Sequence, residues 1–505
     1  MKPKLLAARI LCALIAAFIS LSASAYDFEV DGIYYKITSS TAKTVAVTYS
    51  GDGNPTYNTA EVYSGDIVIP EKVKNNNVEY TVKYISDNAF TGCTNLNSLT
   101  LPETITFLSQ YVFEGCSMKT IKLPKTLSRT ENGVFRNCKN LESITIPDGF
   151  KNLANLLFDG CTNLKTVVLP SSITSIGLWS FQNCASLSQI AIPENVSSIG
   201  NSAFAGCKLI SQIIIPDGVT TLSNGVFSGC ISLKSIQLPD GLKSIQSSAF
   251  YECNSLNQIT IPQGVETIGS MAFSGCTSLT ELKLPETVIS IGYYAFQHCS
   301  KLTSINIPSG VTSIEAGTFS SCAFSSVILP ENLTIIKDHA FQGCSKLTSI
   351  IIPDNVNTIE EAAFTSNSSL KIVEIGTGIK TIGAYAFNYC NSLELITVNA
   401  VEPPTAVEIP EGQTYGGTFN TRHYANTDLR VPYESIEKYK TAPVWENFFK
   451  DRWPLTGIEG VDAAESAESE IVARYDLSGR PVVDDYRGIT IVRRADGSVT
   501  KEIRR

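Results

Sequence analysis

The chain has few residues of the kinds that catalysis and metal binding require. Its 505 residues include only three histidines, and no two of them have the spacing of a metal-binding or catalytic pair. It contains no G-x-S-x-G motif, no phosphate-binding P-loop and no dinucleotide-binding glycine motif. We therefore predict that the protein is not an enzyme and has no catalytic residues, no cofactor and no metal site. A glycosidase, whose two carboxylates need no fixed spacing in the sequence, is a distant alternative.

Charged residues are also sparse. Only 17% of the residues are charged, and the formal net charge is −9. A nucleic-acid-binding protein needs a basic surface to neutralise phosphates, so we expect no nucleic-acid partner. After residue 25 the sequence has no uninterrupted apolar run of about 18 residues, which a membrane-spanning helix needs. We expect no membrane span in the mature chain.

The most regular feature of the sequence is a phenylalanine that returns every 22 or 23 residues. A cysteine follows nearly every one of them three residues later, and an apolar–proline pair precedes most of them by about eleven residues. A fixed period of this size predicts stacked supersecondary units, with an extended surface rather than a catalytic cleft. The fourteen phenylalanines are Phe90, Phe113, Phe135, Phe158, Phe181, Phe204, Phe227, Phe250, Phe273, Phe296, Phe319, Phe341, Phe364 and Phe387.

One period illustrates the expected unit. Ile190 and Ile192 alternate with small or polar neighbours, which predicts a short strand that Pro193 ends. Residues 196–199 should turn the chain inward, and residues 203–204 fit a helical turn. One unit cannot fold alone, because about six buried side chains at about 1.5–3 kcal/mol each do not offset a backbone entropy of roughly 1–2 kcal/mol per residue. We therefore predict an α/β repeat solenoid of about fourteen stacked 23-residue units with a continuous parallel sheet.

The repeated pattern A-F-x-G-C-x-x-L-x-x-I-x-I-P-x-x-V-x-x-I-G, which spans residues 85–398, resembles the leucine-rich repeats of the BspA-like bacterial surface proteins. The pattern departs near Phe364, where Asn367 replaces the cysteine and Gly376 replaces the proline. The resemblance implies a leucine-rich-repeat solenoid in a cell-surface or secreted binding protein. It does not supply a ligand.

The cysteines are predicted to form a buried column of free thiols. Thirteen of the 14 cysteines follow residue 25. Equivalent Cα atoms of stacked units lie about 4.8 Å apart, and parallel Cβ vectors keep the Cβ atoms beyond the usual disulfide range of about 3.5–4.5 Å. Leucine-rich repeats interchange Asn and Cys at this position, and Asn367 fits that exchange. Disulfides, which the secretory route permits, are the alternative, whereas a 23-residue spacing gathers no tetrahedral metal site.

Residues 1–25 are predicted to be a cleaved signal peptide. They combine Lys2, Lys4 and Arg9 with an apolar core over residues 10–21, and they end in Ala-Ser-Ala. A membrane anchor is the alternative, although the apolar run is short for one. We therefore expect an exported protein that is secreted or held at the cell surface.

Two non-repetitive segments should cap the solenoid, because its terminal faces would otherwise be exposed to water. Residues 26–84 predict a β-rich N-terminal cap. Residues 399–455 predict a C-terminal cap with a strand at residues 429–432 and a helix over residues 433–440. Three aromatic residues should pack on the last coil, with an aromatic ligand site as the alternative: Trp445, Phe448 and Phe449.

The last part of the sequence changes composition. Residues 456–470 form an acidic linker, since residues 458–470 hold five acidic residues and no basic one. Residues 471–505 alternate like two or three short strands. Their segments Y-D-L-S-G-R and G-I-T-I-V-R-x-x-D-G-S resemble the C-terminal sorting tail of Bacteroidota proteins exported by the type IX route. The resemblance implies a role in export, and a small β module without that role is the alternative.

Two classes of function fit these features. The first is an adhesin-like protein whose solenoid binds a host or bacterial surface protein or a glycan, and the second is a structural scaffold of the cell envelope without a soluble ligand. On each strand the residue between two buried positions should face solvent, and most such residues are polar. Apolar exceptions on adjacent strands would form a strip of the kind that often marks an interaction site, with ordinary β-propensity as the alternative. These candidate binding residues are Val168, Ala191 and Ile214, expected side by side, and Ile328 with Ile351.

Overall fold

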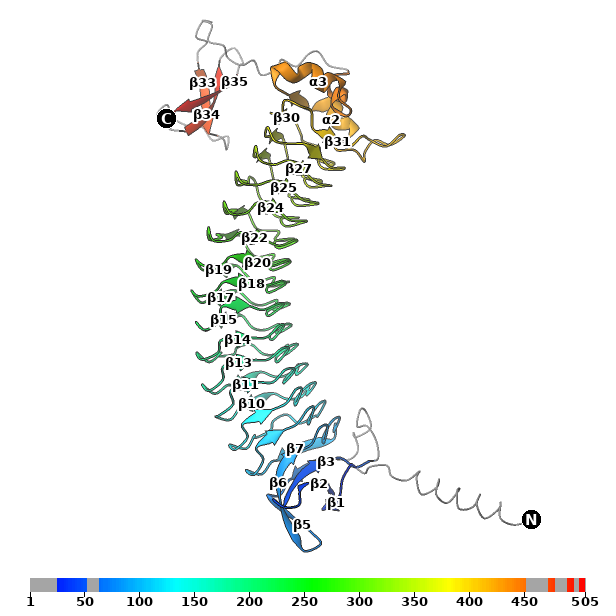
Figure 1. Ribbon diagram of the computed structural model, residues 1–505, viewed down its shortest axis with the longest axis vertical. Coiled ribbons are helices and arrows are strands. Elements are labelled where there is room, and N and C mark those ends of the chain that lie inside the picture. The colour runs from blue at the N-terminus through cyan, green and yellow to red at the C-terminus, as the bar shows by residue number, and fades with distance from the viewer. Residues whose placement is uncertain (1–24, 52–62, 451–470, 477–487, 495–498, 505) are drawn as a thin grey trace, which may run out of the picture.

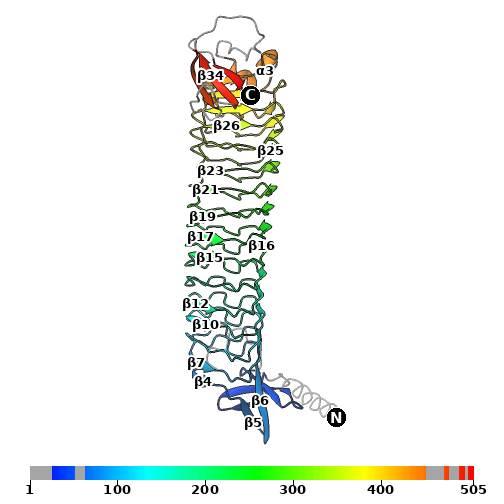
Figure 2. The same cartoon turned by 90° about the vertical axis from the view of Figure 1, so that its left-hand side faces the viewer.

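The computed structural model describes residues 25–51, 63–450, 471–476, 488–494 and 499–504. The repeats form an elongated, gently curved stack of coils, with a β-sheet at the N-terminal end and helices at the other end (Figure 1). Each coil crosses the stack nearly at right angles to the long axis (Figure 2). This architecture confirms the predicted parallel-sheet solenoid of about fourteen turns of roughly 23 residues.

A seven-stranded sheet begins the chain and continues into the coils. Strands β1, β2 and β3 are antiparallel neighbours, β3 pairs in parallel with β6, and β5 pairs with β6 in antiparallel fashion. Strand β6 also pairs in parallel with β8 of the stacked coils, so the terminal sheet covers the edge that the first coil would expose. Five of the seven strands precede the repeats: β1 (Phe28–Val30), β2 (Ile33–Ser39), β3 (Thr44–Thr48), β5 (Lys72–Asn75) and β6 (Val78–Ile85). The other two, β8 (Phe107–Leu108) and β9 (Arg129–Thr130), belong to the coils.

The first of two parallel ladders contains the strands that precede the repeated proline. We call it the first ladder. Equivalent residues of successive coils pair in it, as Ile144 pairs with Val167. Its strands are β4 (Gly65–Val68), β7 (Leu96–Thr100), β10 (Ser143–Thr145), β12 (Thr166–Val168), β15 (Gln212–Ile214), β17 (Ser235–Gln237), β19 (Gln258–Ile259), β21 (Glu281–Leu282), β23 (Ser304–Ile305), β26 (Ser349–Ile352), β28 (Ile372–Ile375), β30 (Leu395–Val398) and β32 (Asp428–Arg430).

The second ladder contains two-residue strands that follow the proline, and it runs along the opposite side of the stack (Figure 2). Residues 196–199, which we expected to form only a turn, contain its strand β14, because Ile199 is buried and its backbone pairs with Ile176. Two ladders therefore replace the single expected sheet. The strands are β8 (Phe107–Leu108), β9 (Arg129–Thr130), β11 (Asn152–Leu153), β13 (Ser175–Ile176), β14 (Ser198–Ile199), β16 (Thr221–Leu222), β18 (Ser244–Ile245), β20 (Thr267–Ile268), β22 (Ser290–Ile291), β24 (Ser313–Ile314), β25 (Ile335–Ile336), β27 (Thr358–Ile359), β29 (Thr381–Ile382) and β31 (Thr405–Ala406).

Neither ladder is continuous, which corrects the expected unbroken sheet. The strand predicted at Ile190 and Ile192 is absent, and this segment interrupts the first ladder between β12 and β15. Ile190 and Ile192 are only half-buried, whereas Ile213 and Ile215 of the next coil are buried. The second ladder is interrupted between β9 and β11, between β14 and β16, and between β22 and β24.

The helical turn expected at residues 203–204 is a series of hydrogen-bonded turns instead. Ser202 and Gly206 have φ angles of 52° and 72°, which an α-helix excludes. The N–H of Phe204 donates to the carbonyl of Val226 in the next coil at 3.0 Å, while neighbouring N–H groups close local turns. The glycine before most of the cysteines fits this left-handed position because it has no Cβ.

The repeated phenylalanines form one stacked column through the core. Successive ring centroids from Phe90 to Phe387 lie 5.1–5.9 Å apart. Tyr63 extends the column at the N-terminal end, and Phe419 extends it at the C-terminal end. The column thus continues one ring beyond the regular repeats in each direction.

The cysteines form a second column, and no disulfide joins any of the thirteen within the described residues. From Cys116 onward each thiol donates a hydrogen bond of 2.9–3.3 Å to the carbonyl of the phenylalanine in the preceding coil. Asn367 makes the equivalent bond from its Nδ2 to Phe341 at 3.0 Å. The exchange of Asn and Cys preserves one hydrogen-bond donor at this position.

The thiol column makes a prediction about alkaline stability. Burial raises the pKa of the Cys138, Cys230 and Cys299 thiols from 9.0 to about 12. Because the folded pKa lies above the unfolded value, this contribution to stability is complete below about pH 9 and is lost as the pH rises towards 12. We expect the melting temperature to fall over this range, and iodoacetamide to label thirteen thiols only after denaturation. Protection of pairs of cysteines in the denatured, unreduced protein would contradict this prediction.

The C-terminal end of the stack carries short helices close to the expected range. The structure has α2 (Thr421–Asn426), η1 (Tyr433–Ser435), α3 (Ile436–Thr441) and η2 (Trp445–Phe448). Trp445 and Phe448 are buried, and both rings contact Phe419 edge-on. Within the described residues no helix has the length and apolar character needed to cross a bilayer.

The tail contains a separate antiparallel sheet of β33 (Ile471–Asp476), β34 (Gly488–Arg494) and β35 (Val499–Arg504). These are the short strands that alternation predicted for residues 471–505. The predicted signal peptide at residues 1–25 lies, except for Ala25, outside the described residues, as does the predicted linker at residues 456–470.

Candidate binding surfaces

All five residues predicted to bind a partner are exposed. Val168 ends β12 with 51% of its surface exposed, and Ile214 ends β15 with 63% exposed. Ile351 lies within β26 at 44%, and Ile328, which belongs to no strand, reaches 86%. Ala191 is exposed in the segment between β12 and β15. Each coil concerned therefore presents apolar atoms to water at the equivalent position.

The expected side-by-side arrangement on paired strands is not found. Val168 belongs to the pair β10–β12, and Ile214 belongs to the group β15–β17–β19. Ala191 lies between them without a strand, so no ladder hydrogen bonds fix the spacing of the three residues. The second predicted group, Ile328 with Ile351, does not extend further, because Ile351 pairs with the charged residue Glu374 on the next strand.

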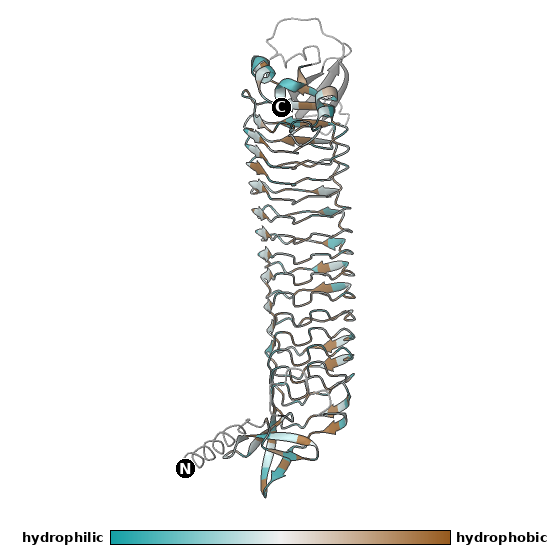
Figure 3. Cartoon of the chain, turned by 90° about the vertical axis from the view of Figure 1, so that its right-hand side faces the viewer, coloured by the Kyte–Doolittle hydropathy of each residue, from teal (hydrophilic) through white to brown (hydrophobic). Residues whose placement is uncertain are grey.

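Two further exposed apolar residues of the first ladder were missed from the sequence. Val68 ends β4 and pairs with Thr100, in the irregular first repeat. Ile372 begins β28 and is exposed at the outward position two residues before Glu374. The alternation of β28 is the signal that could have identified Ile372. Figure 3, which colours the chain by hydropathy, shows hydrophobic (brown) and hydrophilic (teal) residues within the same short strands.

A cavity of about 330 Å³ opens at the break between β22 and β24. Ile289 and Tyr293, both exposed, form apolar parts of its wall. Tyr294 contacts the Tyr293 ring edge-on at 5.9 Å, which fixes one side of that ring. The Glu315 carboxylate in the wall is paired with Lys337 at 2.7 Å.

A larger cavity of about 700 Å³ opens at the break between β9 and β11. Its wall is mostly polar and includes Arg129, Lys151 and Glu131 together with several side-chain amides. A cavity of this size lies within the range of about 300–1,000 Å³ that is usual for small-molecule sites. One feature of the sequence marks this place, because a threonine stands at position 130, where the neighbouring repeats have leucine.

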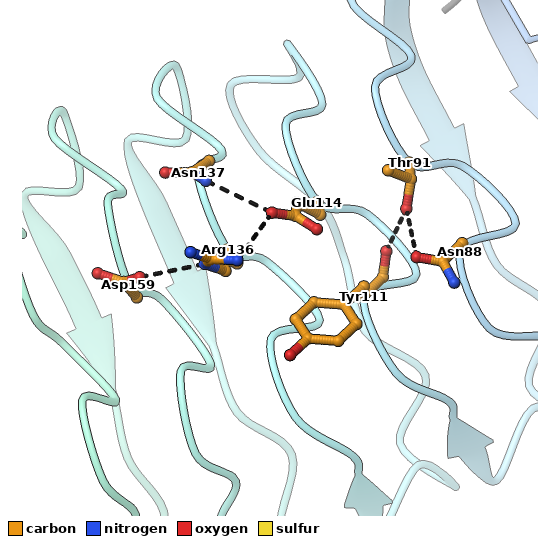
Figure 4. A network of polar contacts seen from close by, with 7 residues as sticks. All are labelled: Asn88, Thr91, Tyr111, Glu114, Arg136, Asn137 and Asp159. Carbon is orange, nitrogen blue, oxygen red and sulfur yellow. Dashed lines mark hydrogen bonds and ion pairs between the residues drawn. The ribbon is translucent and has the colours of Figure 1, made fainter. Parts of the chain in front are cut away.

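A network of ion pairs joins the same coils at their turn edge, the side of the stack formed by the hydrogen-bonded turns that contain the repeated phenylalanines (Figure 4). The guanidinium of Arg136 donates to Glu114 of the preceding coil at 3.3 Å and to Asp159 of the following coil at 3.2 Å. Asn137 also donates to Glu114, at 3.5 Å. Arg136 and Asp159 follow β9 and β11 in their coils, so the turn edge is joined where the second ladder is open.

The buried histidine has a structural role. Burial lowers the pKa of His423 to about 4, so the ring is neutral at physiological pH. Its Nδ1 accepts a hydrogen bond from the N–H of Asn420, which leaves Nε2 to donate to the carbonyl of Cys390 at 3.1 Å. His298 and His339 lie in other coils, and the described residues contain no group of three potential metal ligands.

The repeats match the model of the BspA type leucine rich repeat region over residues 70–188, 174–302 and 290–402, which is more than half of the chain. The chain belongs to the BspA-type leucine-rich repeat family. Among curated proteins, none matches the sequence significantly.

Solved structures of other bacterial leucine-rich repeat proteins resemble this BspA-type chain. A leucine-rich repeat protein from Bacteroides ovatus is 30% identical, with a TM-score of 0.57, over 74% of this chain and 94% of that chain. A leucine rich cell surface protein from Faecalibacterium prausnitzii is 24% identical, with a TM-score of 0.42, over 74% and 94% of the two chains. The pneumococcal vaccine antigen PcpA is 22% identical, with a TM-score of 0.44, over 82% and 95%.

Proposed function

We propose that this protein is an exported, non-enzymatic, adhesin-like protein that binds a partner protein along its first ladder. The observation that carries the proposal is the exposure of apolar side chains at one repeated position of a mostly polar face. These are Val168, Ala191, Ile214, Ile328 and Ile351. Burial of one such isoleucine in an interface is worth about 1.5–3 kcal/mol.

The repeat architecture supports the same function. Leucine-rich-repeat solenoids generally bind proteins, and stacked repeats create the extended surfaces that such binding uses. A similar protein from Faecalibacterium prausnitzii is described as a cell surface protein. The predicted signal peptide and the type IX-like tail would bring this chain to the same location. The partner would be a host or bacterial surface protein.

A double substitution on the first ladder tests the proposal. The purified protein is first applied to an array of extracellular-matrix proteins and glycans, and the strongest ligand is then titrated. We expect Val168→Lys with Ile214→Lys to weaken binding more than tenfold, because each charge would have to be buried where an apolar contact was made. The melting temperature should not change, since both residues are exposed.

The matched control places lysines at exposed polar positions of the same column, through Gln237→Lys and Thr260→Lys. This variant should bind as the wild type does. Unchanged binding by the Val168 and Ile214 variant would reject the first-ladder site. If the array yields no ligand and the same variant abolishes self-association in sedimentation, the envelope scaffold is the correct function.

A further inference from the structure

The coil that contains β9 has an unusual core residue. Thr130 occupies the position that Leu108 and Leu153 hold in the neighbouring coils. The residue is only 8% exposed, and its buried Oγ1 has no hydrogen-bond partner. A buried hydroxyl without a partner is destabilising, and such departures from local rules often occur at functional sites.

The break beside this coil leaves backbone polar groups available. In the preceding pair of coils, the N–H groups of Ser128 and Glu131 donate to Thr106 and Leu108 at 3.3 and 2.9 Å. Across the break between β9 and β11, the equivalent bonds from residues 151 and 154 are missing from the described chain. The cavity therefore combines unused backbone donors on one side with unused acceptors on the other.

Side chains add an excess of hydrogen-bond donors to the cavity wall. Arg129 and Lys151 line it, and within the described part of the chain neither forms an ion pair. The Arg129 guanidinium lies 4.6 Å from the centroid of the Phe107 ring, which limits its movement. Glu131 is the one carboxylate among these lining residues.

Two asparagines in the wall are oriented by their neighbours. The Oδ1 atom of Asn152 accepts a hydrogen bond from the Ser175 hydroxyl at 2.7 Å. The Oδ1 atom of Asn155 accepts one from the N–H of Leu178 at 2.8 Å. Both Nδ2 groups are then left as donors. Among the residues that line the cavity, two cationic side chains and these two amide donors thus outnumber the single carboxylate.

We infer that the cleft between β9 and β11 binds a sugar unit that carries a carboxylate, of the uronic or sialic acid type. Arg129 and Lys151 would bind the carboxylate through charge-assisted hydrogen bonds. The sugar hydroxyls would bind the asparagine amides, Glu131 and the unpaired backbone groups. The site lies on the second ladder, so it does not depend on the protein-binding face proposed above.

Titration of the purified protein with single sugars tests this site. Glucuronic acid and N-acetylneuraminic acid are compared with glucose, which lacks the carboxylate, and with acetate, which lacks the sugar. We expect at least one acid sugar to bind with a Kd of about 1 mM, and glucose and acetate to bind about tenfold more weakly. Absence of binding by both acid sugars, or equal binding by glucose, would overturn the inference.

Substitutions locate the bound sugar. Lys151→Gln and Arg129→Gln should each weaken acid-sugar binding about tenfold, the loss expected for one charge-assisted bond. Lys243 occupies the position equivalent to Lys151 beside the intact pair β18–β20, so Lys243→Gln is the matched control and should bind normally. Lys151 is exposed, so Lys151→Gln should leave the melting temperature unchanged. This variant therefore still tests the site if Arg129→Gln disturbs the packing of Arg129 on Phe107. Wild-type binding by Lys151→Gln and Arg129→Gln would place the sugar elsewhere.

Discussion

Replacement of Phe204 by alanine should lower the free energy of unfolding by about 3–5 kcal/mol, the cost usual for a truncated core aromatic residue. The Phe204 ring is fully buried, and its centroid lies 5.2 Å from that of Phe181 and 5.6 Å from that of Phe227. The coils of Phe181 and Phe227 cannot move together to fill the cavity that the substitution leaves, because backbone hydrogen bonds at the turn edge fix the spacing of the coils. Urea denaturation of the variant against the wild type measures the loss.

Leu209 provides the matched control in the same coil. It is 51% exposed, so Leu209→Ala should change the stability by no more than about 0.5 kcal/mol. A Phe204→Ala loss of less than about 1 kcal/mol would mean that the ring column does not carry the packing energy expected of a core aromatic.

The stack itself could be predicted from the sequence because every coil places the same side chain at the same contact. The positions of the phenylalanines indicate which residues of each coil are buried. The replacement of a cysteine by Asn367 indicates that this position needs a hydrogen-bond donor, which the structure shows. Phe419 continues the column at a ring spacing of 5.6 Å but follows Phe387 by a longer interval than 23 residues. The inserted segment hid it from a periodicity argument.

The two ladders and their breaks were harder to predict. A two-residue strand such as β14 leaves no alternation to read, so residues 196–199 resembled a turn. The pairing of backbone groups depends on the distance between coils, which no residue type marks directly. The missing strand at Ile190 illustrates this, because its sequence pattern matches that of paired neighbours.

For the candidate binding residues, exposure could be predicted from the sequence but contiguity could not. Their exposure followed from the alternation of buried and outward positions, and the structure places Val168, Ile214 and Ile351 on outward positions of strands. Their contiguity required an intact ladder, which the sequence could not establish. Thr130 was visible as a polar residue in an apolar column, but the cavity beside it follows from the broken pairing of β9 and β11.

Truncation of Trp445 to alanine should cost about 3–5 kcal/mol and should act on the C-terminal coils first. The Trp445 ring is fully buried and contacts Phe419, the last ring of the column, edge-on at 5.5 Å. Its Nε1 donates to the carbonyl of Pro404 at 2.7 Å, so the substitution also leaves a buried carbonyl without its donor. Hydrogen exchange should show lost protection near Phe387 while the coil of Phe204 stays protected.

Two further variants separate packing from the hydrogen bond. Trp445→Phe keeps an aromatic ring against Phe419 but removes the Nε1 donor. We expect it to cost about 1–3 kcal/mol, the penalty for the unpaired carbonyl, which is less than the cost of Trp445→Ala. Tyr433→Ala changes an aromatic residue of the same cap that is 64% exposed, and it should have little effect. Repeat proteins couple mainly to their nearest neighbours, and a cap therefore stabilises the coils next to it. Uniform loss of protection along the whole stack after Trp445→Ala would instead show that the solenoid unfolds as one cooperative unit.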